Sequence, residues 1–436
     1  MSSSDASSHV PSLINPRDFG ARGDGHNLDT TAIQAAINAS GEIGGGIVSV
    51  PPGHYLTGAL FFQNNVTLQL DPGAVILGSE DPADYPIKPN RWEGEERLTH
   101  SPLIGGSGLS NISLSGHGVI DGRGEYWWKA YWEKQLEYPR PRLIGFNDCT
   151  NILIDGLTLI NSPSWTVNPV RCGNVSIHGL TIINPPDSPN TDGINPDSCN
   201  LVRISDCRVS GGDDCITLKA GTQREHPELR QACRDITITN CRLERGHGGL
   251  VIGSEMSGDV RNVTISNCVF VGTDRGIRMK SRRGRGGVVE NIRIDNLLMD
   301  GVLCPFTINM YYHIGARGDP VVSDKNHRPV DEGTPSFRHI HISQVSAVNV
   351  KIAAAFLYGL AEMPLEDITF NEISITLSNS TEGGHAEMAD DIPIMSRAGF
   401  FVRNARRLRL ENVVVNGQEG PAFDMDDSVE AEIYPK

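Results

Sequence analysis

The 436-residue chain has few aromatic side chains and no long hydrophobic segment. Phe, Trp and Tyr make up 6% of the residues, and no stretch is long and apolar enough to cross a bilayer as a helix. Basic residues are also in deficit, because 38 Lys and Arg stand against 53 Asp and Glu, a net charge of −15. A field of this sign repels nucleic acid and anionic membranes, so we expect neither as a partner.

Cysteine pairs with the spacing of a metal site or a redox motif are missing too. None of the nine cysteines forms a C-x-x-C pair, which argues against a zinc site or a thioredoxin-like motif. We expect mostly buried free thiols in a reducing compartment. The first residues, MSSSDASSHVPSLINPRDFG, lack the apolar core of a signal peptide. We therefore expect a cytoplasmic protein, or a secreted one if a leader precedes this sequence; the oligomeric state stays open.

A short β-strand pattern is what the sequence has in abundance. Segments such as NILIDGLTL, NVSIHGLTI and NVTISNCVF begin at residues 151, 174, 201, 235, 262 and 291. In each copy, further apolar residues follow the first one at the +2, +5 and +7 positions. The first apolar positions are Ile152, Val175, Val202, Ile236, Val263 and Ile292. Stacked units of this kind predict an all-β fold, a single-domain right-handed parallel β-helix, which is a solenoid.

The segment TTAIQAAINASGEIGGG carries the only clear helical periodicity, with Ile33, Ala36 and Ile37 at helical spacing. We expect a helix over residues 30–40 to cap the N-terminal end of the solenoid and cover its unpaired strand edge. No internal domain boundary is visible. We therefore expect a tail over residues 1–16 and a catalytic β-helix domain over 17–436, with the insertions at 315–336 and 381–399 as loops.

A second strand in each repeat carries polar residues. Aligning DGINPD, DCITLK, GGLVIG, RGIRMK and FTINMY gives an inward phase of Ile194, Ile216, Leu250, Ile277 and Ile308. Alternation turns two sets outward, Asn195, Thr217, Val251, Arg278 and Asn309, then Asp197, Lys219, Gly253, Lys280 and Tyr311. Just before these strands lie Asp192, Asp213, Asp214 and His247. Because rungs are about 4.8 Å apart, we expect one shared cleft with an acid/base site.

The motifs NTD (190–192), GDD (212–214), GHG (246–248) and RMK (278–280) follow one another on this face. Together with DFGARGDG and GVIDGRGEYWW, this sequence resembles the polygalacturonase family of glycoside hydrolases, family 28. The basic run KSRRGRGG is similar to the bacterial and exo-acting branch. The resemblance implies inverting hydrolysis of α-1,4-galacturonosidic bonds in pectic polygalacturonate or oligogalacturonides, from a chain end, with no cofactor and no metal.

The resemblance also implies a role for each site residue. Asp213 would be the general acid, and Asp192 and Asp214 would hold and activate the attacking water across a gap of about 6.5–9.5 Å. His247 would tune their protonation, and Arg278 and Lys280 would bind a uronate carboxylate. The other expected substrate-binding residues are Tyr311, Lys219, Glu255 and Asn190.

Simpler interpretations of the same residues stay open. Asp213 and Asp214 could be a turn pair or calcium ligands, and His247 could be an ordinary histidine in a Gly-rich turn. The arginines after Lys280 could be a solvated run, and Trp165 could fill the core rather than stack on a sugar. Alternative functions are a rhamnogalacturonan galacturonohydrolase, a calcium-dependent lyase on the same fold and a non-catalytic carbohydrate-binding solenoid.

Overall fold

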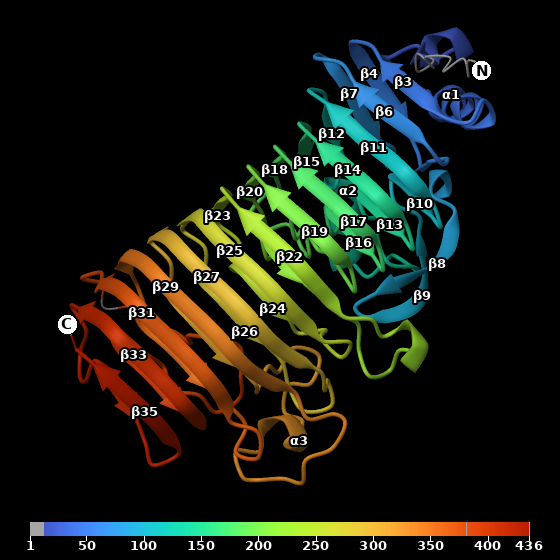
Figure 1. The fold of residues 1–436 in the computed structure, drawn as a ribbon. Helices are drawn as coiled ribbons and strands as arrows, with labels where there is room; N and C mark the ends of the chain where they lie inside the picture. The colour runs from blue at the N-terminus through green and yellow to red at the C-terminus, as the bar shows by residue number, and fades with distance from the viewer. Residues whose placement is uncertain (1–12, 381, 436) are drawn as a thin grey trace, which may run out of the picture.

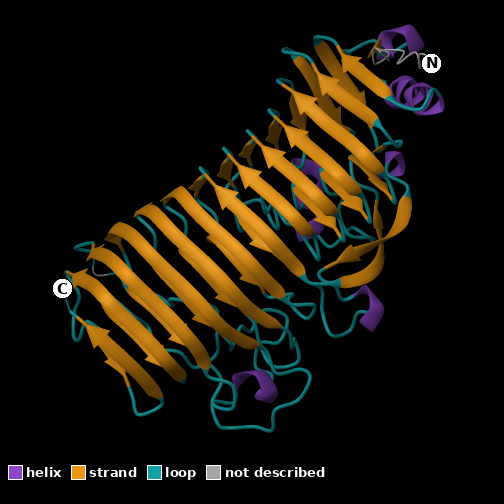
Figure 2. Ribbon diagram, in the orientation of Figure 1, coloured by secondary structure: helices purple, strands orange, loops and turns teal. Residues whose placement is uncertain are grey.

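A computed structural model of the protein describes residues 13–380 and 382–435. The chain winds into a long stack of strands, with the N-terminal and C-terminal segments at opposite ends (Figure 1). Strands dominate, and the few helices lie outside the stack (Figure 2). Consecutive turns pair in parallel, so the predicted right-handed parallel β-helix is confirmed.

The repeat strands form a 22-stranded sheet in the described residues. Its strands are β1 (Leu13–Ile14), β2 (Asp24–Leu28), β3 (Gly46–Val50), β4 (Gly53–Thr57), β6 (Val66–Leu70), β7 (Ala74–Gly78), β11 (Ser110–Gly116), β12 (Val119–Asp121), β14 (Thr150–Asp155), β15 (Thr158–Ile160), β17 (Gly173–His178), β18 (Thr181–Ile183), β19 (Asn200–Ser205), β20 (Arg208–Ser210), β22 (Cys233–Thr239), β23 (Arg242–Glu244), β25 (Val260–Val271), β27 (Val288–Asp300), β29 (Ser336–Val350), β31 (Leu365–Leu377), β33 (Ala405–Asn416) and β35 (Val429–Tyr434). The predicted apolar positions lie directly opposite one another from Ile152 to Ile292, and all are buried.

A second face carries the strands that matter for the site, in two sheets. The first holds β5 (Leu60–Phe61), β10 (Ile104–Ser107), β13 (Ile144–Asn147) and β16 (Val167–Val170). The second holds β21 (Ile216–Leu218), β24 (Gly248–Gly253), β26 (Arg275–Lys280), β28 (Cys304–Asn309), β30 (Ala353–Tyr358), β32 (Ala398–Arg403) and β34 (Phe423–Met425). Ile194 bridges both Val167 and Ile216, so the two sheets continue one another. The residues before β21 and β24 therefore lie on one continuous face.

Asparagines hold the corners between strands in register. Asn111, Asn151 and Asn174 all have a positive φ, of 58°, 56° and 54°, and asparagine tolerates this left-handed conformation better than most residues. The side-chain amide of Asn151 donates to Asn111, and that of Asn174 donates to Asn151, both at 2.8 Å. The ladder fixes the same bend in successive rungs.

Helix α1 (Thr30–Glu42) closes the N-terminal end of the stack, as predicted. It buries Ile33, Ala36 and Ile37 completely against the first rungs. The tail predicted over residues 1–16 lies outside the described residues up to residue 12. Residues 13 and 14 form β1, which pairs with β3, so this part of the expected tail belongs to the fold.

The sequence pattern did not predict several other elements. Helix α2 (Glu125–Trp132) is a second helix, and it buries Trp127 and Trp128. The antiparallel hairpin of β8 (Ile87–Trp92) and β9 (Glu95–His100) projects from the stack. The remaining helices are α3 (Pro320–Ser323) in the 315–336 insertion and 3-10 turns at Pro16–Phe19, Pro82–Asp84 and Pro227–Leu229.

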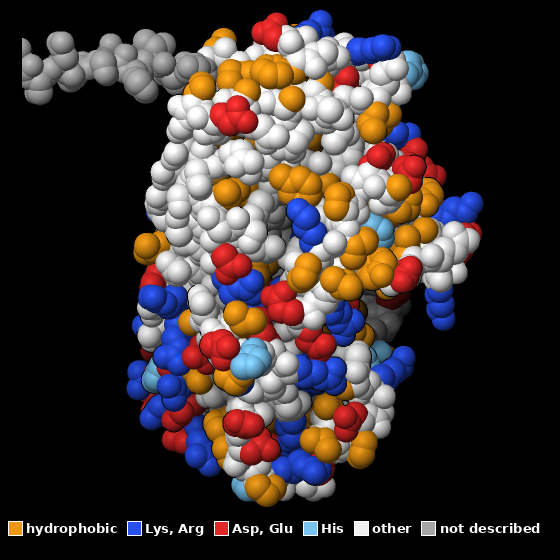
Figure 3. Space-filling model, turned by 90° about the vertical axis from the view of Figure 1, so that its right-hand side faces the viewer, with side chains coloured by type: hydrophobic (Ala, Val, Ile, Leu, Met, Phe, Trp, Pro, Cys, Tyr) orange, Lys and Arg blue, Asp and Glu red, His pale blue; other side chains and the backbone are white. Residues whose placement is uncertain are grey.

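The nine cysteines are all buried and unbridged, as the sequence predicted. Within the residues that the structure describes, no helix has the length and apolar character needed to cross a membrane. On the face seen in Figure 3, basic and acidic side chains are intermixed and gather toward the C-terminal end, whereas the N-terminal part carries fewer charges.

Candidate active site

A pocket of about 510 Å³ opens on the face of β21, β24 and β26. Its floor includes the three aspartates that the motifs singled out. Its walls come from the β8–β9 hairpin, from the segment after β26 and from the segment after β28. Residues far apart in the sequence therefore meet at one concave site.

The three aspartates converge as predicted. One carboxylate oxygen each from Asp192, Asp213 and Asp214 lies within 4.8 Å of the other two. Such a cluster could hold a divalent cation as well as an acid/base pair. These oxygens lie closer together than the about 6.5–9.5 Å expected between the carboxyl groups of an inverting glycosidase.

Asp214 is held in its ionised form. It is 2% exposed, and it accepts hydrogen bonds from Lys280 Nζ at 2.7 Å and from Arg278 Nη1 at 3.2 Å. Burial alone would raise the pKa of this carboxyl, but the charges of Lys280 and Arg278 outweigh it and hold the pKa well below its usual value. Asp214 is therefore a carboxylate across the working pH range.

Asp192 and Asp213 are shifted the other way. Burial, with the charges of Asp213 and Asp214 next, raises the pKa of Asp192 to about 8. Burial and the neighbouring Asp214 charge also raise the pKa of Asp213. Asn195 Nδ2 donates to Asp192 Oδ2 at 2.9 Å and orients that carboxyl. The pair thus retains a proton at neutral pH beside an ionised third carboxylate.

His247 lies next to this pair, and hydrogen bonds to Asp213 and Asp274 fix its position. Its backbone N–H donates to the Asp213 carbonyl at 3.3 Å, and its Nδ1 lies 2.9 Å from Asp274 Oδ2. The hydrogen bond to Asp274 and the charges of Asp213 and Asp214 raise the pKa of His247 against the effect of burial. A protonated imidazole here favours ionised carboxylates in the cluster.

Arg278 lies differently from expectation. Its guanidinium is 1% exposed and makes a bidentate pair with Glu387, with Nη2–Oε1 at 2.6 Å and Nε–Oε2 at 2.9 Å. Its fork is therefore engaged by the protein, while Lys280 lines the pocket. Glu387 was missed because it lies in the 381–399 insertion, 109 residues from its partner and with no strand pattern around it.

The predicted register of the last site strand is wrong by two residues. Ile277 lies opposite Phe306 rather than Ile308, and Lys280 lies opposite Asn309 rather than Tyr311. The Tyr311 side chain is fully buried and packs on Tyr358, away from the pocket.

The neighbouring Tyr312 lines the pocket in place of Tyr311. Its ring centroid lies 5.1 Å from Lys280 Nζ. The two-residue difference in register is not visible in the sequence, because FTINMY alternates equally well in either register.

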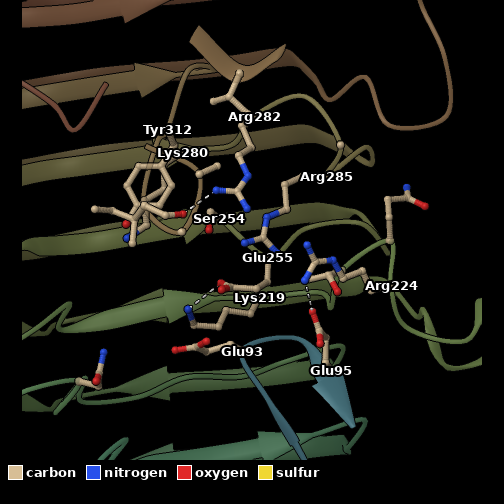
Figure 4. A pocket seen from close by; sticks show the side chains of 18 of the residues that line it. Glu93, Glu95, Lys219, Arg224, Ser254, Glu255, Lys280, Arg282, Arg285 and Tyr312 are labelled. Carbon is tan, nitrogen blue, oxygen red and sulfur yellow. Dashed lines mark hydrogen bonds and ion pairs between the residues drawn. The ribbon is translucent and has the colours of Figure 1, made fainter. Parts of the chain in front are cut away.

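The other expected binding residues do line the pocket. Lys219 Nζ donates to Glu255 Oε2 at 2.9 Å (Figure 4), and Asn190 Oδ1 accepts from Arg140 Nη2 at 2.7 Å. Burial opposes ionisation of Glu255, but Lys219 and a nearby arginine, Arg285, lower its pKa to about 2. Contact of these residues with a substrate stays a prediction.

The β8–β9 hairpin forms one wall of the pocket. Its two turn residues, Glu93 and Gly94, have positive φ values of 51° and 79°, as a tight hairpin turn requires. Thr222 Oγ1 donates to the Gly94 carbonyl at 3.0 Å and ties the tip to the segment after β21. Close to the tip, Arg91 pairs with Asp197 at 2.6 Å and also with Glu225.

Trp165 lines the same pocket but is only 6% exposed. Its ring stacks on Trp92 of the hairpin, with centroids 4.8 Å apart and planes 21° apart. Most of the indole therefore packs against protein, in keeping with the core-filling alternative.

Comparison with known proteins agrees with this geometry. The profile described as Glycosyl hydrolases family 28 matches residues 87–388, and one described as Rhamnogalacturonase A/epimerase, pectate lyase-like matches residues 13–84. The first match includes the hairpin, the three aspartates and Glu387. The chain belongs to glycosyl hydrolase family 28, and it is a glycoside hydrolase.

Individual relatives carry related names. A "Probable polygalacturonase" of Vitis vinifera is 34% identical over 380 residues, which cover 85% of this chain and 75% of that protein. An "Endo-polygalacturonase" of Pectobacterium carotovorum subsp. carotovorum is 30% identical over 299 residues, 65% of this chain and 72% of that one. The crystal structure of a hyperthermoactive exopolygalacturonase from Thermotoga maritima superposes with a TM-score of 0.78 at 29% identity, covering 94% of this chain and 93% of that one.

Proposed function

We propose that this enzyme hydrolyses α-1,4-galacturonosidic bonds of polygalacturonate and its oligomers. One observation carries the proposal: the buried Asp192 and Asp214 and the half-buried Asp213 converge with opposite protonation preferences, in a pocket rich in cations. Family membership and the names of the relatives support the same substrate class.

In the proposed mechanism, Asp213 donates its proton to the glycosidic oxygen as the bond from C1 to that oxygen breaks. Asp192 and Asp214 hold a water molecule, whose oxygen bonds to C1 while Asp192 takes its proton. The productive state therefore has one proton on the Asp192–Asp213 pair, located on Asp213. Lys219 and Lys280 stabilise the ionised carboxylates, since the charge of Lys219 favours the ionised form of Asp192.

We propose inversion at C1, because Asp192 and Asp214 act on water rather than on the sugar. The proposal of inversion does not depend on the spacing of the aspartate oxygens, which is short. It depends on Asp192 and Asp214 holding one water molecule between them. NMR of the first product tests it, since an α-linked substrate should give the β-anomer first. Initial appearance of the α-anomer would exclude inversion.

We also propose that cleavage proceeds from a chain end. The β8–β9 hairpin forms one wall of the pocket and its tip is tied to the segment after β21, which favours a closed pocket over an open groove. The T. maritima exopolygalacturonase shares this overall fold, and the P. carotovorum relative is named as an endo enzyme. The proposal of cleavage from a chain end therefore depends on the wall that the β8–β9 hairpin forms.

A product profile tests the proposed function. Polygalacturonate and defined oligogalacturonides should release monomer or one short product from the first minutes, with no unsaturated sugar and equal rates in excess chelator. Rhamnogalacturonan oligomers serve as the competing substrate. Ultraviolet-absorbing products that require calcium would indicate a lyase, and preference for the rhamnogalacturonan pieces would replace the proposed substrate.

A further inference from the structure

The cations of the pocket can be sorted by their partners. Most already neutralise a carboxylate of the protein. The ion pairs are Lys219 with Glu255, Lys280 with Asp214, Arg283 with Glu362, and Arg97 and Arg224 with Glu95. Among the described residues, the remaining pocket cations, Arg282 and Arg285, form no direct ion pair with a carboxylate, although the charge of Arg285 acts on Glu255.

These two arginines lie on one short segment after β26, and both are half-buried. Figure 4 shows both guanidinium groups facing into the pocket beside Glu255 and Lys280. Nη1 of Arg282 donates to the Ile314 carbonyl at 2.5 Å, which fixes its position. Nε of Arg285 is buried without any hydrogen-bond partner. A buried donor without a partner costs free energy, because it has lost its hydrogen bond to water. A bound acceptor would replace that hydrogen bond.

Two neighbouring guanidinium groups repel one another. Burial and the charge of Arg285 lower the pKa of Arg282, and the charge of Glu255 offsets this only in part. An anion placed between them would relieve this repulsion and accept hydrogen bonds from both. Arginine forks fit a planar carboxylate especially well.

We propose that Arg282 and Arg285 bind the carboxylate of a galacturonate residue and act as the acid-specific determinant of the pocket. This inference rests on the proposed function, and it gives the pair a role that the RMK motif does not cover. Arg278 remains on Glu387, and Lys280 remains on Asp214.

Binding of digalacturonate and of its methyl diester, measured by calorimetry, tests the pair. Turnover is blocked by Asp213→Asn, and Arg282→Gln with Arg285→Gln is added to that background. We expect at least tenfold weaker binding of the diacid, because charge-assisted hydrogen bonds are lost, and less than threefold change for the diester. Arg282→Lys with Arg285→Lys should recover part of the loss. Arg293→Gln, an exposed arginine on β27 outside the pocket, is the matched control.

Melting temperatures confirm that each variant is folded before binding is compared. Equal losses for diacid and diester, or no loss for either, would overturn the assignment of the arginine pair. That outcome is separate from failure of the proposed function, which would appear as a wild-type enzyme that releases no galacturonate from oligogalacturonides.

Discussion

At the scale of single residues, the site shifts the pKa values of its aspartates in two opposite directions. Asp214 faces two buried cations, whereas Asp192 faces mainly other carboxyl groups and an amide donor. The pKa of Asp214 therefore falls and that of Asp192 rises to about 8. Burial and the Asp214 charge also raise the pKa of Asp213, so the proposed proton donor Asp213 lies beside the ionised, water-binding Asp214.

Replacing Asp213 by Asn should remove turnover and preserve the fold. The exchange keeps the shape of the side chain and deletes the transferable proton, and general acid catalysis typically contributes about 10²–10⁴-fold. We expect kcat to fall by at least that factor on oligogalacturonides, with an unchanged melting temperature. Serine in place of the exposed Thr150 provides a control for handling. Turnover within a factor of a few of wild type would exclude Asp213 as the acid.

Replacing Asp192 by Asn should stabilise the protein, increasingly so as the pH rises. The folded-state pKa of about 8 lies above the ordinary 3.8, so the folded protein binds more protons than the unfolded chain between these values. This contribution to stability is complete below pH about 4 and is lost toward pH 8, by up to about 1.4 kcal/mol per unit. Denaturant unfolding at pH 5 and pH 8 measures it. An advantage that shrinks with pH would contradict the raised pKa.

Replacing Arg278 by Ala should destabilise the fold as well as the site. Glu387 and Asp214 would lose a buried partner, and breaking such a pair costs about 3–5 kcal/mol. We expect lower melting temperature and equal activity losses on acidic and esterified substrates. Adding Glu387→Gln should recover part of the stability, because it removes the stranded charge. A melting temperature equal to wild type would mean that this pair contributes nothing to stability.

The sequence identified the aspartates because Asp192 and the adjacent pair Asp213–Asp214 precede aligned strands of successive repeats. It could not place Arg278, since strand alternation gives the direction of a side chain but not its partner. Glu387 lies in the 381–399 insertion, and this segment has no strand periodicity from which the position of its side chains could be predicted. The wrong register at Tyr311 has a similar cause, because two registers of FTINMY bury equally apolar residues.

At the scale of elements, the sequence predicts the repeat strands well and the β8–β9 hairpin poorly. The repeat strands of the 22-stranded sheet carry the same apolar phase many times, so their register follows from the sequence alone. The β8–β9 hairpin occurs once, and Glu93–Gly94 is an unusual turn pair for it. Its position over the site depends on Arg91 meeting Asp197 and Glu225, contacts more than a hundred residues away.

Removing the hairpin should open the pocket into a groove. Residues 89–98 would be replaced by Asn-Gly, a turn that suits a two-residue loop between Lys88 and Thr99. Asp197→Asn and Glu225→Gln would avoid buried carboxylates without Arg91. We expect longer products and faster loss of polymer viscosity per bond cleaved. The two amide substitutions with the hairpin intact are the control.

An unchanged profile of terminal products in the shortened variant would show that the hairpin does not set the exo mode. Internal cleavage by the control variant as well would assign the effect to the ion pairs of Arg91 rather than to the wall itself. Comparing the two variants therefore separates the effect of the hairpin as a pocket wall from the effect of the ion pairs that hold it in place.

At the scale of the whole molecule, two opposing electrostatic effects act on an acidic substrate. The net charge of −15 repels a polyanion at long range, whereas the pocket cations attract a carboxylate at short range. Salt screens the first more than the second, since the Debye length falls from about 30 Å at 0.01 M to about 10 Å at 0.1 M. Long chains carry many charges outside the pocket, and a dimer carries almost none.

The ratio of kcat/KM for long polygalacturonate to that for digalacturonate should therefore rise between 0.01 and 0.1 M salt. We expect the value for the polymer to increase, because repulsion outside the pocket is screened, and the value for the dimer to stay level or fall. Defined chain lengths at constant pH give the measurement, with a methyl-esterified polymer as the uncharged control. Parallel falls for polymer and dimer would mean that the attraction of the pocket cations extends beyond the site and outweighs the net charge.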